Sequence, residues 1–500
     1  MRSRSPSSVA LSPLDRRAFL RAAALLGAGA TLPGWLAGCG NVAALDAVGP
    51  LEVDPARPWW LQNGFGPVAG EIDAVDLEVR GALPPELDGL YVRNGSNPQN
   101  ADSPHWFLGD GMLHGVRLRS GRALSYRNRY VRTPLYEQGL SGLGGGLPSG
   151  GNNLSNVSVI WHGGRLLSSG EVGAGYAIDP ADLSTLGVHD FNGAVQTSFT
   201  AHSKIDPVTG HLHFFGYWFM PPYLTYLVAD ATGQVIHRTE IPVRTGTMMH
   251  SFAITERDVI FWELPVIFDT RGIAVHGFPF LWNDDYGARI GVMPLGGSAG
   301  DIRWAEIPPC YVFHELNAYR ATSDEIVLDV CRYERMMDGE RFGTFEPHLH
   351  RWHLDTGGAG LGFRDEVLEG ERVLEFPVHD RRFAGRAHRH GFFAEPRRNS
   401  GTIDVGGLVH RDFLTGHSET WDPGLAVGAG EPLFVPASAA AGEGEGWLVT
   451  FVYDRARDES RLAVIDATRV ARGPVAEVVM PRRVPHGFHG CWVPGEALAG

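Results

Sequence analysis

The chain has 500 residues, and its 43 basic and 57 acidic side chains give a formal net charge of −14. This acidic balance argues against a nucleic-acid partner, because proteins that bind polyanions usually carry a basic surface. Hydrophobic residues make up 43% and charged residues 20% of the chain, which excludes a disordered protein and indicates a folded core.

Residues 1–39 form a predicted export signal. A twin arginine, Arg16-Arg17, precedes an uncharged apolar stretch over residues 22–36, which is shorter than the roughly 20 residues of a membrane-spanning helix. A Leu-Ala-Gly-Cys segment ending at Cys39 is similar to a lipobox, in which Cys39 would carry a lipid. We expect export to the periplasm or cell envelope, with membrane association through a lipid anchor. The alternative is an ordinary secretory signal with a chance cysteine.

The next residues, 40–75, are expected to be a linker or N-terminal extension, and residues 76–500 a single catalytic domain. The 65 glycines and 33 prolines favour many short strands joined by turns. Turn signals at residues 206–210 and 230–233 separate short runs rich in β-branched and aromatic residues. Residues 326–330 (IVLDV) are typical of a central buried strand. Further strands are predicted at residues 211–217, 235–241, 258–262 and 447–453.

Many short strands without an internal linker favour a closed all-β fold. A β-propeller uses about 40–50 residues per blade, so this length accommodates seven blades with insertions. Two irregular insertions, residues 141–153 and 265–285, are expected to form a cap of loops and short helices over a central site. Aromatic and apolar residues expected to line a tunnel beneath it are Trp106, Phe107, Trp218, Phe219, Met220, Tyr223, Phe278, Phe280 and Trp282.

Four of the 21 histidines lie just before or within predicted strands: His202, His250, His314 and His489. Their separations of 48, 64 and 175 residues correspond to about one blade, one blade with an insertion, and several blades. A propeller brings corresponding positions of different blades onto its axis, so this spacing is compatible with convergence there. His486 lies in the same short run as His489 and competes with it.

Five segments, in order along the chain, resemble the carotenoid cleavage oxygenase family, which includes apocarotenoid oxygenases, lignostilbene dioxygenases and animal retinoid enzymes. They are residues 88–98 (DGLYVRNGSNP), 109–114 (GDGMLH), 126–133 (YRNRYVRT), 329–333 (DVCRY) and 487–490 (GFHG). The resemblance implies a seven-bladed propeller with a non-haem Fe(II) on its axis. It implies four ligands, and its G-F-H-G pattern selects the last of them over His486: His202, His250, His314 and His489.

The family orients its histidine ligands with glutamates that accept a hydrogen bond from the second ring N–H. The matching positions here are Glu171, Glu375 and Glu431. Two departures stand out. Family members usually have His-Asp where this chain has His250-Ser251, and Asn-Thr-Asn-Val where it has residues 156–159 (NVSV), with Val157 in place of the threonine. The resemblance thus implies the loss of a carboxylate and a hydroxyl near the iron, but of no ligand.

The activity implied by the resemblance is cleavage of a conjugated C=C bond of a carotenoid or apocarotenoid by O2, giving two carbonyl products. The alkene supplies the electrons, so no reductant is needed, and no Rossmann, P-loop or haem-attachment motif is present. Lignostilbene-type relatives are expected to anchor a phenol with a lysine, whereas the single lysine, Lys204, is expected away from the substrate. Alternatives are a stilbene or phenylpropanoid alkene dioxygenase, a polyene isomerase, and a non-catalytic periplasmic propeller that binds a hydrophobic ligand.

Overall fold

The computed structural model describes residues 54, 56–140, 150–338, 346–397 and 405–498. The predicted export signal, with Cys39, lies outside the described residues, as do residues 141–149 of the first predicted insertion. The described part of the chain contains 33 strands, and its α-helices are α2 (Pro134–Glu137) and α3 (Arg271–His276). Within these ranges, no helix has the length and apolarity needed to cross a bilayer.

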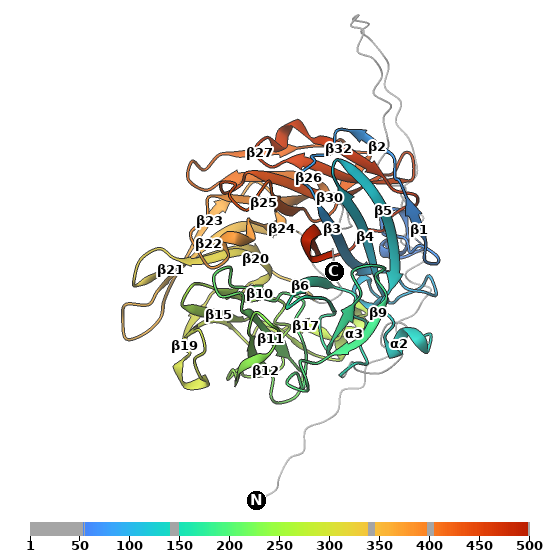
Figure 1. Ribbon diagram of the computed structural model, residues 1–500. Helices are drawn as coiled ribbons and strands as arrows, with labels where there is room; N and C mark the ends of the chain where they lie inside the picture. The colour runs from blue at the N-terminus through green and yellow to red at the C-terminus, as the bar shows by residue number, and fades with distance from the viewer. Residues whose placement is uncertain (1–53, 55, 141–149, 339–345, 398–404, 499–500) are drawn as a thin grey trace, which may run out of the picture. The chain divides into compact units, whose positions relative to one another are not determined.

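Seven antiparallel sheets are arranged around a centre as the blades of a propeller (Figure 1), which confirms the predicted all-β, seven-bladed fold. The second blade consists of β6 (Ser158–His162), β7 (Arg165–Ser169), β8 (Gly175–Ile178) and β9 (Thr185–His189). The third consists of β10 (Lys204–Ile205), β11 (Leu212–Tyr217), β12 (Leu224–Ala229) and β13 (Val235–Glu240). The fourth consists of β14 (Ala253–Ile254), β15 (Asp258–Glu263), β18 (Ala288–Pro294) and β19 (Arg303–Ile307). The fifth blade consists of β20 (Tyr311–Arg320), β21 (Glu325–Tyr333), β22 (His348–Asp355) and β23 (Gly362–Glu369). The sixth consists of β24 (Glu375–Val378), β25 (His390–Pro396), β26 (Val405–Asp412) and β27 (Ser418–Trp421).

The first and seventh blades combine strands from both ends of the chain. The first blade runs β1 (Asp73–Val75), β5 (Arg122–Tyr130), β4 (Gly111–Arg119), β3 (Gly89–Ser96) and β33 (Gly490–Pro494). The seventh runs β2 (Val79–Gly81), β32 (Pro474–Val479), β31 (Glu459–Asp466) and β30 (Gly446–Asp454), with β28 (Val427–Ala429) and β29 (Leu433–Pro436) both paired to β30. The ladders β3–β33 and β2–β32 close the ring, and closure protects the edges that an open sheet would expose.

Burial explains why these segments form strands. The middle strands β11 and β12 are buried along their whole length and carry nearly continuous apolar runs, whereas the outer strand β13 alternates half-buried and exposed residues. Residues 326–330 lie in β21, between β20 and β22, which confirms the prediction of a central buried strand. The strands predicted near residues 211, 235, 258 and 447 are also confirmed, as β11, β13, β15 and β30.

The innermost strands carry the site. Each blade places one strand at the inner end of its sheet, and those of neighbouring blades contact one another: β14 with β20, β20 with β24, and β33 with β6. The predicted insertion at residues 265–285 forms the hairpin β16 (Val266–Phe268) and β17 (Phe280–Trp282), joined by α3. The short 3-10 helices are η1 (Trp59–Leu61), η2 (Asn63–Phe65), η3 (Trp106–Leu108), η4 (Ala299–Asp301), η5 (Arg381–Phe383), η6 (Val470–Arg472) and η7 (Gly495–Leu498).

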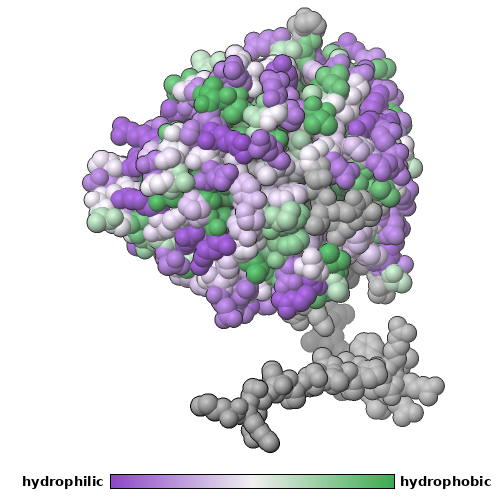
Figure 2. Space-filling view, turned by 90° about the horizontal axis from the view of Figure 1, so that it is seen from below, coloured by the Kyte–Doolittle hydropathy of each residue, from purple (hydrophilic) through white to green (hydrophobic). Residues whose placement is uncertain are grey.

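The described residues before residue 76 pack against the propeller. Trp59 and Phe65 contact the ring of Trp106, and β1 pairs with β5. The domain boundary at residue 76 stays a prediction. On the face shown in Figure 2, hydrophilic and hydrophobic residues are mixed.

Candidate metal centre and active site

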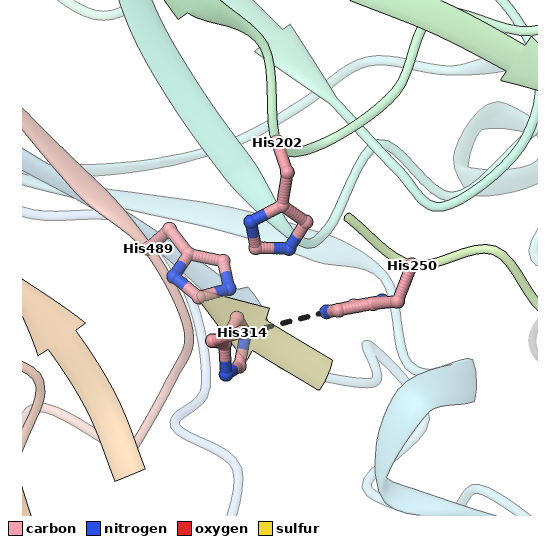
Figure 3. Close-up of side chains that lie close together, drawn as sticks. All are labelled: His202, His250, His314 and His489. Atoms are coloured by element: carbon pink, nitrogen blue, oxygen red, sulfur yellow. Dashed lines mark hydrogen bonds between the residues drawn. The ribbon is translucent and has the colours of Figure 1, made fainter. Parts of the chain in front are cut away.

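Four histidines converge at the inner ends of four blades. His202 lies two residues before β10, His250 three residues before β14, His314 within β20, and His489 directly before β33. Their rings turn toward one another in Figure 3, and one ligand atom from each lies within 4.8 Å of those of the other three. The structure therefore brings together all four histidines that the resemblance implied as ligands.

The competing residue His486 lies elsewhere. Its backbone N–H donates to the carbonyl of Gly64, and its ring packs on Phe65 with ring centres 4.8 Å apart. His489 instead approaches His202 and His314, with ring centres 4.5 and 5.0 Å apart. The geometry thus identifies His489, and not His486, as the fourth candidate ligand.

Each predicted glutamate lies against one of the four imidazoles. Nδ1 of His250 lies 3.0 Å from Oε1 of Glu171. Nδ1 of His314 lies 2.6 Å from Oε2 of Glu375, and Nδ1 of His489 lies 2.7 Å from Oε1 of Glu431. A carboxylate only accepts hydrogen bonds, so in each pair the imidazole donates its Nδ1–H.

This hydrogen bonding directs lone pairs into the centre of the site. A neutral imidazole that donates through Nδ1 has an unprotonated Nε2, which is a lone-pair donor to a metal. Nε2 of His250 and Nε2 of His314 lie 3.3 Å apart, the contact that is dashed in Figure 3. With both protons on the Nδ1 atoms, neither Nε2 has a proton to donate, and the two lone pairs repel each other. Nε2 of His202 is buried and has no hydrogen-bond partner among the described residues. A cation bound between these nitrogens would remove the repulsion and would give Nε2 of His202 a bonding partner. The residues therefore fit a metal.

Burial adjusts the protonation of the site in the direction that metal binding needs. It lowers the pKa of His202 and of His314 well below the usual range, and the neighbouring imidazoles lower both further. Both rings are therefore neutral at pH 7, as ligands must be. Glu375 is the exception, because burial raises its pKa to about 7 and so favours the protonated acid, against the opposing effect of the N–H of Phe376 and the phenol of Tyr333.

Two tyrosines complete the carboxylate contacts, and the sequence analysis missed them. The hydroxyl of Tyr217 donates to Glu171 at 3.0 Å, and that of Tyr333 donates to Glu375 at 2.9 Å. Burial raises the pKa of both phenols well above the usual range, so both keep their protons. No local sequence signal marks them, because each reaches its glutamate from another part of the chain.

An apolar cavity opens onto three of the imidazoles. His250, His314 and His489 are part of its wall. Six of the nine predicted tunnel residues line it, and Met220, Tyr223 and Trp282 do not; among the lining residues described there is no lysine or arginine. The aromatic lining consists of Trp106, Phe107, Tyr217, Trp218, Phe219, Phe268, Phe278, Phe280, Phe313, Tyr333, Phe376 and Phe488.

The two departures from the family pattern also lie at the site. Val157 lines the cavity, and its carbonyl accepts the backbone N–H of His489 at 3.0 Å. The amide of Asn156 donates to the carbonyls of Phe107 and Gly109 and so holds η3 against the cavity. Ser251 and Lys204 lie outside the cavity lining, in contact with Glu315.

Comparisons with known proteins agree with this geometry. Residues 65–494 match the family model described as retinal pigment epithelial membrane protein, RPE65. The chain is 36% identical to a carotenoid cleavage oxygenase of Mycobacterium tuberculosis, over 87% of this chain and 97% of that relative. It is 31% identical to an isoeugenol monooxygenase of Pseudomonas nitroreducens, over 86% and 96%.

A solved structure is similar as well. The lignostilbene dioxygenase of Pseudomonas brassicacearum superposes with a TM-score of 0.80 at 30% identity, over 87% of this chain and 98% of that one. The likeness in sequence and in fold thus extends over nearly all of the described residues. The chain therefore belongs to the RPE65/carotenoid oxygenase family and is a carotenoid oxygenase-type enzyme.

Proposed function

We propose that this protein is an Fe(II)-dependent dioxygenase that cleaves a conjugated C=C bond of a carotenoid or apocarotenoid into two carbonyl products. The observation that carries the proposal is the convergence of four imidazoles, three of them bonded to carboxylates, beside an apolar cavity. The relatives include a carotenoid cleavage oxygenase, which supports the reaction class.

The four histidines would hold the metal. Imidazole nitrogen suits iron, and a carboxylate on the second ring nitrogen raises ligand basicity. When bound, ferrous ion supplies the binding and activation of O2. The reaction balances without a reductant, because the C=C bond breaks and each carbon receives one oxygen atom of O2.

The cavity wall would position the substrate. Trp106, Phe107 and Phe488 pack against one another on one side of the lining, with the rings of Trp106 and Phe488 centred 4.4 Å apart. Flat aromatic walls hold a planar polyene in a fixed orientation and exclude water from the reacting bond. Such positioning contributes to the rate by placing one double bond against the metal rather than by proton transfer.

The lining favours a hydrocarbon over a phenol. A hydroxystilbene carries a phenolic oxygen that needs a hydrogen-bond donor when it is buried, and the described lining residues include neither lysine nor arginine to supply one. The amide of Asn156 already donates to two backbone carbonyls. Tyr217 and Tyr333 already donate to glutamates. These contacts leave the described wall with few free donors for a substrate, namely groups such as the hydroxyl of Thr247 and the indole N–H of Trp106.

The test is a substrate panel under ¹⁸O2. Purified, Fe(II)-loaded protein is incubated with carotenoids, apocarotenals and hydroxystilbenes, and the products are read by mass spectrometry. We expect cleavage of a polyene into two carbonyl products, each labelled with ¹⁸O. Cleavage of hydroxystilbenes alone would overturn the choice of substrate.

A stilbene or phenylpropanoid alkene dioxygenase is the second candidate, because the chain is similar to a lignostilbene dioxygenase and to an isoeugenol monooxygenase. The same panel separates the two. It also addresses polyene isomerisation, whose products gain no oxygen. A non-catalytic binding protein would leave every substrate unchanged and would not require iron.

We also propose that the protein is exported and anchored at the cell envelope through Cys39. The twin arginine Arg16-Arg17 and the lipobox-like segment support this location, and an anchored enzyme would meet a membrane-soluble polyene. Cell fractionation of the wild type and of Arg16→Lys/Arg17→Lys tests export, and radiolabelled palmitate tests lipidation of Cys39. Retention of the wild type in the cytoplasm would contradict export.

A further inference from the structure

Three polar residues closely follow the histidines of the third, fourth and fifth blades along the chain. Lys204, Ser251 and Glu315 follow His202, His250 and His314 by two, one and one residues. Each is fixed to the same short stretch of backbone as one imidazole. A contact among the three therefore links the backbones that carry three of the four histidines.

The three side chains contact one another closely. The ammonium of Lys204 forms an ion pair with the carboxylate of Glu315. The hydroxyl of Ser251 donates to Oε2 of Glu315 at 2.6 Å, and Nζ of Lys204 lies 3.4 Å from Oγ of Ser251. The side chain of Glu315 is 4% exposed, and Ser251 is fully buried. The ammonium also lies 5.9 Å from the centre of the Phe252 ring.

This group is separate from the substrate cavity. None of the three residues lines the cavity, so none is placed to touch a substrate there. The strands β10, β14 and β20 belong to three different sheets, and no ladder joins these sheets among the described strands. Side-chain contacts such as these consequently tie the three blades together beside the site.

We propose that Lys204, Ser251 and Glu315 form a clamp that presets the positions of His202, His250 and His314 and thereby strengthens metal binding. Without a metal, the facing nitrogens of His250 and His314 repel each other at 3.3 Å. The ion pair between Lys204 and the buried Glu315, together with the hydrogen bond from Ser251, holds these backbones together against that repulsion. The metal then meets ligands that are already in place, which lowers the cost of ordering them.

The clamp also explains the departure at position 251. The resemblance predicts an aspartate there, and the structure places the carboxylate of Glu315 on the hydroxyl of Ser251 instead. A half-buried ammonium such as that of Lys204 is stabilised by a carboxylate partner. Because Oγ of Ser251 lies 3.4 Å from Nζ of Lys204, a carboxylate at position 251 would also reach the lysine. We therefore expect a carboxylate at position 251 to take the place of the one at position 315.

The test measures metal affinity and the stability of the metal-free protein separately. Glu315→Gln removes the carboxylate, and Ser251→Asp/Glu315→Gln returns one from the neighbouring blade. Ferrous ion is titrated anaerobically against a competing chelator, and urea unfolding is followed on the metal-free proteins. We expect Glu315→Gln to weaken binding roughly ten- to a hundredfold, the range for residues that orient metal ligands. We expect the double variant to recover most of that loss.

Two further variants keep the outcome decisive. Ser251→Ala leaves the ion pair in place and removes one hydrogen bond, so we expect affinity to fall only about two- to tenfold; it is the fallback if Glu315→Gln does not fold. Asp258→Asn is the matched control. Asp258 forms a largely buried ion pair with Arg320 between the fourth and fifth blades, at 2.7 Å. The two residues lie eight residues after His250 and six residues after His314 along the chain. Asp258→Asn should lower stability without changing ferrous affinity.

The clamp is refuted if Glu315→Gln, or Ser251→Ala in its place, binds ferrous ion as tightly as the wild type. It is also refuted if Ser251→Asp/Glu315→Gln binds no better than Glu315→Gln. The inference rests on the proposed metal centre, but different results would contradict the metal centre and the clamp. A wild-type protein that binds no ferrous ion contradicts the centre, whereas a wild type and clamp variants that bind equally contradict only the clamp.

Discussion

Replacing Glu431 tests whether the carboxylates behind the imidazoles act on the metal. Glu431 lies between β28 and β29, where Oε1 accepts Nδ1–H of His489 at 2.7 Å and Oε2 accepts the backbone N–H of Gly490 at 3.2 Å. Glu431→Gln keeps the shape of the side chain and removes its charge. The glutamine offers one carbonyl oxygen, so one of the two N–H donors now faces an NH2 group.

Two separate losses follow from this geometry. A buried donor without an acceptor costs about 1–3 kcal/mol, and we expect the free energy of unfolding of the metal-free protein to fall by about that amount. The lost charge makes His489 a weaker ligand, so we expect ferrous affinity to fall roughly ten- to a hundredfold. Glu431→Asp keeps the charge and should retain more affinity than the glutamine variant.

The assay combines urea unfolding with an anaerobic ferrous titration. Glu366→Gln is the matched control, because Glu366 also pairs with a histidine, His353, at 3.1 Å but is 45% exposed. Exposed pairs contribute about 0–1 kcal/mol, so this variant should change neither measurement appreciably. Ferrous affinity in Glu431→Gln equal to that of the wild type would refute the role of the carboxylate.

Three further predictions concern pH, the cavity and the cysteines. Burial raises the pKa of Glu375 from 4.5 to about 7, so this carboxyl group makes the metal-free protein less stable as the pH rises through that window. The stability of Glu375→Gln relative to the wild type, measured by urea unfolding, should therefore increase from pH 5 to pH 8, and a difference that is the same at both pH values would contradict the prediction. Trp218 lines the cavity, and Trp218→Ala should lower kcat/KM for a polyene about five- to thirtyfold, equivalent to about 1–2 kcal/mol of lost apolar contact, with ferrous affinity unchanged. Burial raises the pKa of Cys310 and Cys491 to about 12 and that of Cys331 well above its usual range, so peptide mapping after iodoacetamide at pH 8 should find these thiols labelled only after unfolding; labelling of the native protein would disprove their burial.

The parts of this structure that were predictable are those with local signals. The alternation of turn signals with short apolar runs predicted strands such as β11 and β21. The resemblance of the G-F-H-G segment to the family distinguished His489 from His486. The contacts that escaped prediction all join different blades. Tyr217 reaches Glu171, Tyr333 reaches Glu375, and the two ends of the chain pair in β3–β33 and β2–β32. Closure of the ring creates these contacts, and the residues within one blade do not specify them.

Glu315 is an instructive omission. It directly follows His314, and the chain has a single lysine, two residues after His202. Those two facts together were a signal for a buried ion pair beside the site. Each taken alone reads as an ordinary surface charge, because isolated charged residues are usually exposed. Only the placement of β10 beside the inner ends of β14 and β20 turns them into one group.

The most direct test of the metal centre is anomalous diffraction at the iron edge from crystals of the ferrous-loaded protein. We predict one strong peak, surrounded by Nε2 of His250, Nε2 of His314 and the facing ring nitrogens of His202 and His489. A peak at any other group of side chains, or none in crystals whose solution contains excess ferrous ion, would contradict the account.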